Sequence, residues 1–154
     1  AGHGYGALDL FHLYGDSDGP FPRNGFQPWR KAMAYEGSRQ VGFMRRLFEL
    51  RPWYKLVPDQ SVIAAGQGEG EDHVRAARAE DGSFIIAYMP SGKPVSIKME
   101  KVSRKSVKAN WFDPREGTWR EVGEYPNTGN QEFIPPSQGE QSDWVLVLED
   151  GANS

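Results

Sequence analysis

The opening residues, AGHGYG, place His3 and Tyr5 between glycines, a pattern that suits the rim of a ligand-binding site. Imidazole and phenol groups exchange hydrogen bonds with a ligand, and the glycines let that ligand approach the backbone closely. His12 follows in the same segment. Because loops often carry function, these three are candidate substrate-binding residues, although a structural loop explains the pattern equally well.

The spacing of possible ligands does not indicate a metal site. The three histidines form no HxH or HxxxH pair. The segment DSDG (16–19) starts like a calcium loop, but Pro20 and Gln27 stand where the fifth and twelfth positions need oxygen ligands. A turn is the better interpretation. The acidic stretch GEGED (68–72) could hold a weakly bound calcium ion, but a solvated loop is the better interpretation. We predict no metal and no cofactor.

Nucleophilic catalysis is also unsupported, because the chain has no cysteine and no GxSxG motif. Acidic residues are plentiful, so a pair of carboxylates at glycosidase separation stays open. Most of them, however, fall in turns or on alternating strand positions, where solvation explains them. We predict no catalytic residue in this chain.

Aromatic residues offer the best binding hypothesis, because exposed rings can stack on sugars. Trp111 shares an alternating face with Val107, and Trp144 shares one with Leu146, so both are expected in the core. Trp119 follows a turn and stands next to Arg120, which makes it the best candidate for an exposed, substrate-binding ring.

Composition limits the classes of protein and partner. The 154 residues are 38% hydrophobic and 25% charged with a net charge of −3, as in one ordinary folded domain with an appended piece. Without a basic stripe, nucleic acid is not an expected partner. The longest apolar runs, 83–89 and 144–148, are too short to span a bilayer, so no membrane is expected either. The lack of cysteine excludes disulfides but leaves the compartment open.

A helix is predicted over Ser38–Leu50, ended by Pro52. Its apolar face is expected to consist of Val41, Met44, Leu47 and Phe48, with the opposite face around Phe43 as the alternative.

From about Asp59 the hydrophobic period changes to two, and the 18 glycines and 11 prolines favour short strands joined by turns. These features predict an antiparallel β-sandwich. The runs in 83–89 and 143–149 are apolar on both faces, so these strands are expected to be central. The eight predicted strands are Ser61–Ala65, His73–Glu80, Ser83–Met89, Pro94–Glu100, Val107–Asp113, Thr118–Gly123, Gln131–Ile134 and Asp143–Glu149.

Five motifs in order resemble a known family: RPWYKLVPDQSVI (51–63), DGSFIIAYMPSG (81–92), VKANWFDPREGTW (107–119), EFIPP (132–136) and DWVLVLE (143–149). They are similar to the C-terminal end of apiosidase-like bacterial glycoside hydrolases. In that family a (β/α)8 barrel precedes a β-sandwich that bears the name "putative collagen-binding domain of a collagenase".

The resemblance implies that residues 1–58 are the loop and helix of the last β/α unit of the barrel, and that residues 59–154 are the sandwich. His3, Tyr5 and Gly6 match the family's loop after the eighth barrel strand, which would make them a rim of the sugar site. Phe11-His12 stands where the family pattern has a Trp-Gln pair. The catalytic carboxylates belong to earlier strands, which we expect to precede Ala1.

We therefore expect a mainly β, non-catalytic accessory domain that stabilises a catalytic barrel, its partner, and that is inactive as this chain alone. Two alternatives are open: a module that binds polysaccharide or collagen, and a glycosidase fragment that contributes a substrate-rim loop. The resemblance also implies a secreted or periplasmic protein.

Overall fold

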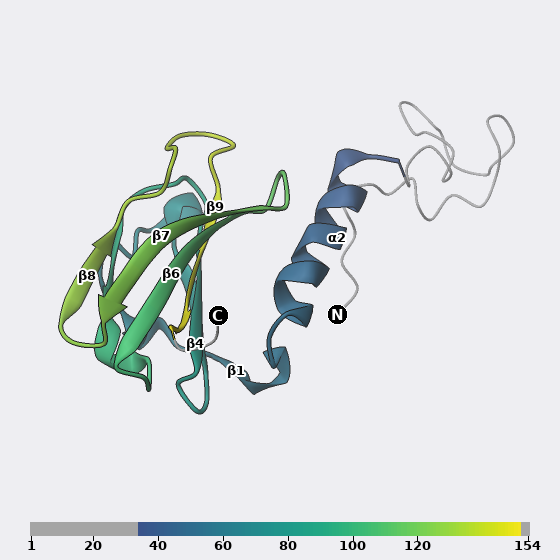
Figure 1. Cartoon of the computed structure of the whole chain (residues 1–154). Helices are drawn as coiled ribbons and strands as arrows, with labels where there is room; N and C mark the ends of the chain where they lie inside the picture. Colours follow the sequence, from purple (N-terminus) through teal and green to yellow (C-terminus); the bar gives the residue numbers. More distant parts are fainter. Residues whose placement is uncertain (1–33, 152–154) are drawn as a thin grey trace, which may run out of the picture. The chain divides into compact units, whose positions relative to one another are not determined.

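The computed structural model describes residues 34–151, which form one α-helix, four short 3-10 helices and nine β-strands (Figure 1). The chain divides into two compact units, residues 1–47 and 48–154. No helix within 34–151 is long and apolar enough to cross a membrane.

Helix α2 spans Glu36–Glu49, close to the predicted range. Glu36 in its first turn and Arg46 in its last turn both oppose the charge of the helix macrodipole. The predicted apolar face is only partly correct, because Met44 is 42% exposed while Phe43 and Leu47 are buried. These two residues are one helical turn apart, so the buried stripe combines one residue from each of the two faces that the sequence offered.

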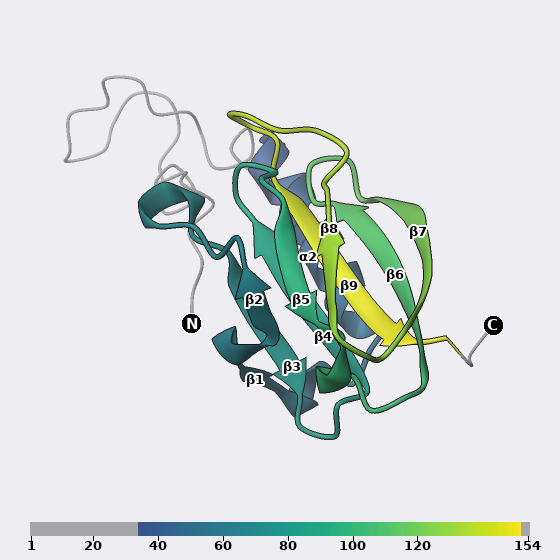
Figure 2. The same cartoon turned by 90° about the vertical axis from the view of Figure 1, so that its left-hand side faces the viewer.

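The larger sheet has six antiparallel strands in the order β1-β3-β4-β9-β6-β7. The smaller sheet has three antiparallel strands in the order β2-β5-β8, and Figure 2 shows it in front of the larger one. The predicted antiparallel sandwich is therefore confirmed. The strand bounds are β1 Leu56–Pro58, β2 Ile63–Ala65, β3 Arg75–Ala79, β4 Phe84–Met89, β5 Val95–Lys98, β6 Ser106–Asp113, β7 Thr118–Pro126, β8 Asn130–Phe133 and β9 Trp144–Asp150.

Strands β4 and β9 lie at the centre of the larger sheet, as predicted from their continuous apolar runs. One face of each packs toward the smaller sheet, where Ile85 and Leu146 join the core. The alternate residues Val145 and Val147 point to the opposite face, and they too are buried. Burial on both faces explains why neither strand shows polar alternation.

The core between the sheets contains both tryptophans that were expected there. Trp111 is 4% exposed and Trp144 is 2% exposed, and their ring centroids lie 6.4 Å apart in an edge-to-face arrangement. Edge-to-face packing is the favoured geometry for aromatic pairs. Phe133 from β8 and Met99 from the 3-10 helix Met99–Lys101 close the core from the smaller sheet's side.

The strand predictions were wrong at several ends. Strand β1 was missed because it ends in Pro58, and proline argues against a strand except at a sheet edge, where β1 lies. The predicted strands at 61–65 and 94–100 each lose one end to a 3-10 helix, Gln60–Val62 and Met99–Lys101. Strand β7 continues past a bulge, where the register against β6 shifts between Ala109 and Asn110.

We expect Leu146→Ala to lower the free energy of unfolding by about 2–5 kcal/mol, because it leaves a cavity at a fully buried central position. Ile134, which is 67% exposed, provides the control. Ile134→Ala should change the free energy of unfolding by less than about 0.5 kcal/mol in the same urea titration. Equal effects of the two substitutions would contradict the assigned core.

Candidate functional site

The predicted substrate-binding residues differ in what the structure says of them. His3, Tyr5 and His12 lie outside the described residues 34–151. Trp119 is described, on the edge strand β7 just after the turn that joins it to β6. The structure therefore provides the surroundings of one of the four residues.

Trp119 ends a row of cross-strand neighbours on the outer face of the larger sheet. Tyr88 pairs with Val145, Val145 pairs with Phe112, and Phe112 pairs with Trp119. We call these four residues the Trp119 row. Its inner members are almost fully buried, while Tyr88 and Trp119 at its ends are each 38% exposed. Trp119 is thus partly exposed, as the sequence suggested, and its ring packs against the neighbouring Phe112.

Two neighbours fix the Trp119 ring. The Phe112 ring centroid lies 4.8 Å away at an angle of 51°. The Arg51 guanidinium carbon lies 5.0 Å from the centroid of the indole, within the range of a cation–π contact. An arginine over the ring occupies a position in which a sugar would otherwise stack.

Arg51 also binds Glu149 at the end of β9. Its Nε donates to Oε2 at 2.9 Å and its Nη2 donates to Oε1 at 3.1 Å, so the pair is bidentate. The Arg51 side chain is only 9% exposed, whereas most arginine side chains are largely solvated. We call the contacts of Arg51 with Glu149 and Trp119 the Arg51 clamp. It joins the segment after α2 to strands β7 and β9.

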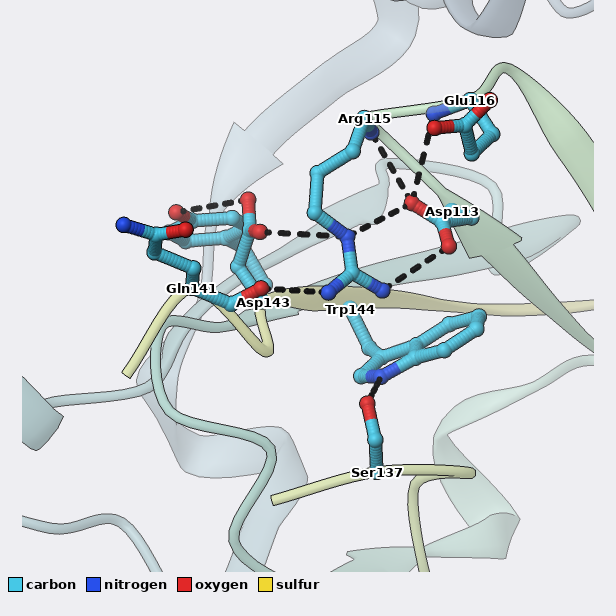
Figure 3. A network of polar contacts seen from close by, with 8 residues as sticks. Asp113, Arg115, Glu116, Ser137, Gln141, Asp143 and Trp144 are labelled. Atoms are coloured by element: carbon cyan, nitrogen blue, oxygen red, sulfur yellow. Dashed lines mark hydrogen bonds and ion pairs between the residues drawn. The ribbon is translucent and has the colours of Figure 1, made fainter. Parts of the chain in front are cut away.

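A second arginine organises a polar cluster beside the core (Figure 3). The Arg115 Nε and Nη2 atoms donate to the Asp113 carboxylate at 2.9 and 2.8 Å, and Arg115 also donates to the carbonyl oxygen of Gln141. The same guanidinium lies 5.1 Å from the Trp144 ring centroid. Arg115 thereby connects the β6–β7 turn to the segment before β9 and covers the edge of the core.

Burial alone would raise the pKa of Asp113, the one buried charged residue among those described. Hydrogen bonds from the Arg115 side chain and from the backbone amides of Arg115 and Glu116 outweigh that penalty, so its pKa lies below the ordinary value. At the other side of the cluster, burial and the nearby Asp143 raise the pKa of Tyr88 to about 12. The Tyr88 hydroxyl donates to the Asp143 carboxylate at 3.2 Å, which favours the neutral phenol.

Gly92 allows the loop before β9 to approach the β4–β5 turn. Its φ is +63°, and a Cβ there would overlap the Ser137 carbonyl oxygen and lie 2.7 Å from that of Ser142. The close approach lets the Trp144 indole Nε1 donate to the Ser137 hydroxyl at 2.9 Å. The indole, the only polar group of a buried tryptophan, is thereby satisfied.

Two further polar features are explained by contacts within the protein. His73 contacts Gln60 at 3.3 Å and the Gly68 carbonyl at 3.2 Å. A surface pocket of about 320 Å³ between the β4–β5 turn and neighbouring loops contains the ion pair of Lys93 and Asp72, 2.5 Å apart. No group of three or more possible ligands for a metal occurs within residues 34–151.

Comparison with known proteins gives the family. Residues 57–149 match the family described as "Putative collagen-binding domain of a collagenase". This match covers more than half of the chain, so the chain belongs to that family. Residues 1–55 match the "Apiosidase-like, catalytic domain" family. The resemblance that the five sequence motifs indicated is confirmed.

Solved structures agree with these matches. A glycoside hydrolase superposes with a TM-score of 0.78 at 28% identity, over 89% of this chain and 31% of the other. A glycoside hydrolase family 5 protein from Bacteroides vulgatus ATCC 8482 superposes with a TM-score of 0.75 at 30% identity, over 83% of this chain and 27% of the other. The chain thus spans less than a third of either relative. No curated protein matches it.

Sequence reasoning missed both arginine-centred arrangements. Arg51 and Glu149 lie 98 positions apart, and nothing local distinguishes either from an ordinary surface charge. Arg115 and Asp113 are two positions apart in the sequence DPREG, whose proline and glycine predict only a turn. A signal did exist there, since an aspartate before a Pro turn often accepts backbone amide hydrogens.

The lowered pKa of Asp113 predicts a specific acid sensitivity. A group with a depressed folded-state pKa stabilises the fold above its ordinary value of 3.8, and this contribution is lost as the pH falls through the folded-state pKa. Asp113→Asn should cost about 1–3 kcal/mol of unfolding free energy at pH 7. It should also flatten the loss of stability below pH 4, measured by urea unfolding over a pH series. Glu116→Gln in the same turn is the control, and equal behaviour of both variants would contradict the assignment.

Gly92→Ala and Gly129→Ala form a matched pair that separates steric overlap from backbone strain. Both glycines have a similar positive φ, +63° and +69°, but a Cβ at Gly129 would meet no atom within 4 Å. Gly129→Ala should therefore cost only the left-handed backbone penalty, about 1–2 kcal/mol. Gly92→Ala should cost more and also shift the fluorescence of Trp144. Indistinguishable melting temperatures would show that the two loops are not closely packed.

Proposed function

We propose that this chain is the non-catalytic accessory sandwich of a glycoside hydrolase-like protein, together with the last piece of its catalytic domain, and that it stabilises the catalytic barrel. The Arg51 clamp carries this proposal. Arg51 lies in the segment that matches the catalytic family, while its partners Glu149 and Trp119 lie in the sandwich match.

The clamp lies within the compact unit 48–154, and its geometry suits a fixed attachment of the segment that carries Arg51 to the sandwich. A bidentate arginine–carboxylate pair fixes distance and orientation together, which a lysine could not do. Because the Arg51 side chain is nearly excluded from water, removing one partner would leave a poorly solvated charge, so breaking this pair costs more than breaking an exposed one. The face of the Arg51 guanidinium also lies over the Trp119 ring, so one side chain contacts two strands.

The ionisation of two partly enclosed carboxylates does not suit the general acid of a glycosidase. A general acid in glycoside hydrolysis needs a raised pKa. Asp113 and Asp59, both partly enclosed, instead have lowered pKa values, Asp59 mainly because the Ser61 hydroxyl donates to it. They are held as structural anions.

The test compares the 154-residue chain with a full-length protein that carries the catalytic domain ahead of it. The chain alone should hydrolyse no glycoside, while the full-length protein should. Deleting residues 59–154 from the latter should lower the melting temperature of the barrel. Hydrolysis by the chain alone, or a barrel unaffected by the deletion, would overturn the proposal.

Arg51→Ala should lower the free energy of unfolding of the full-length protein by about 1.5–3 kcal/mol, because it removes both contacts of the Arg51 clamp. Arg104→Ala is the matched control, because Arg104 pairs with the neighbouring Asp150 at 3.1 Å but is 67% exposed. Its loss should cost less than about 1 kcal/mol.

The exposed edge of Trp119 favours one second candidate, a module that binds polysaccharide or collagen. Binding of the isolated chain to a glycan array or to immobilised collagen, abolished by Trp119→Ala, would support it. The substrate-rim role of His3, Tyr5 and His12 is proposed only on the resemblance. The same resemblance supports our proposal that the protein is periplasmic or secreted.

A further inference from the structure

The segment between α2 and β1 exposes three large apolar side chains. Leu50 is 69% exposed, Trp53 is 57% exposed and Tyr54 is 73% exposed. Single exposed apolar residues are ordinary, but a short segment that exposes three of them, two being aromatic rings in contact, is typical of an interaction surface. We call these three residues the linker patch.

The backbone that carries the linker patch is held in place. Trp53 and Tyr54 belong to the 3-10 helix Trp53–Lys55, and the amide of Lys55 donates to the Pro52 carbonyl at 3.0 Å. The Lys55 carbonyl accepts from the Glu80 amide at 2.9 Å, and the Lys55 ammonium lies 2.7 Å from Asp81. The neighbouring Arg51 is bound to Glu149. Exposed rings on a fixed backbone are prepared for binding, because little entropy remains to be lost.

We propose that the linker patch docks against the part of an apiosidase-like catalytic domain that lies outside this chain. This proposal rests on the proposed function. The match to the catalytic family ends at residue 55, and the match to the sandwich family begins at residue 57, so all three patch residues belong to the catalytic side. More than two thirds of each structural relative lies beyond the region shared with this chain.

The composition of the patch favours a protein partner over a sugar. Tryptophan and tyrosine beside a desolvated arginine are the residue types that dominate the centres of protein interfaces. The Trp53 and Tyr54 rings meet edge to face, 6.4 Å apart at 75°. Rings at that angle present no common plane on which successive sugar units could stack.

Hydroxyl-radical footprinting tests the proposal without any substitution. Trp53 and Tyr54 should be labelled readily in the isolated 154-residue chain and several-fold less in the full-length protein with its catalytic domain. Ile134, which is 67% exposed on the segment after β8, is the internal reference and should be labelled equally in both. Equal labelling of Trp53 and Tyr54 in the two proteins would overturn the proposal.

The double variant Trp53→Ser/Tyr54→Ser gives the second measurement. In the isolated chain it should leave the melting temperature unchanged, because both rings are exposed there. In the full-length protein it should make thermal inactivation several-fold faster, while Ile134→Ser does not. Unchanged inactivation in the full-length double variant would count against the interface.

The outcomes separate this inference from the proposed function. If deleting the sandwich destabilises the barrel but the patch stays labelled, the function stands and the interface lies elsewhere, which overturns the inference. If the isolated chain dimerises through the patch and the full-length protein shows no protection, a second copy is the partner and the inference is wrong. Glycan binding that is lost in the double variant, again without protection, would assign the patch to sugars and would equally overturn it.

Discussion

The structure depends on a central pair of strands, β4 and β9, that must be buried on both faces. Their register joins six residue pairs, from Phe84 with Glu149 to Met89 with Trp144. One face closes the core against the smaller sheet, and the other presents Ile86, Val145 and Val147 away from it. Strand β3 pairs with β4, and β6 pairs with β9. The register of the central pair therefore also fixes which residues of the other strands of the larger sheet lie side by side.

The Trp119 row is a direct consequence of that register. Val145 on β9 determines which residue of β6 stands beside it, Phe112, and Phe112 in turn determines the position of Trp119 on β7. Trp119, one of the two exposed ends of the row, is therefore positioned by the buried central strand β9. The Trp119 ring packs against Phe112 and lies under Arg51, and only its remaining surface is exposed.

At two places an arginine side chain connects a loop to the larger sheet. Arg51 and Arg115 each bind a carboxylate with two nitrogen atoms and lie over a tryptophan ring. A planar guanidinium can make both contacts at once, through its edge and through its face. Lys55 joins its neighbour Asp81 at a more exposed site through a single ammonium.

The amino-acid sequence by itself determined the sandwich, the central position of β4 and β9, and the burial of Trp111 and Trp144. Each of these follows from the alternation or continuity of apolar residues along a few neighbouring positions, which depends only on local order. The family, too, could be recognised from five ordered motifs. The 3-10 ends of two predicted strands were missed, because propensity changes little over three residues.

Only the tertiary structure decided which charged residues matter. Arg51 meets Glu149 across 98 positions, and the buried anion Asp113 looks in the sequence like any aspartate of a turn. Contacts of this kind arise from strand order and register, which bring distant segments together and exclude water from some of them. Whether a charge is solvated, paired or stacked on a ring is a property of that enclosure, and no local pattern of residue types encodes it.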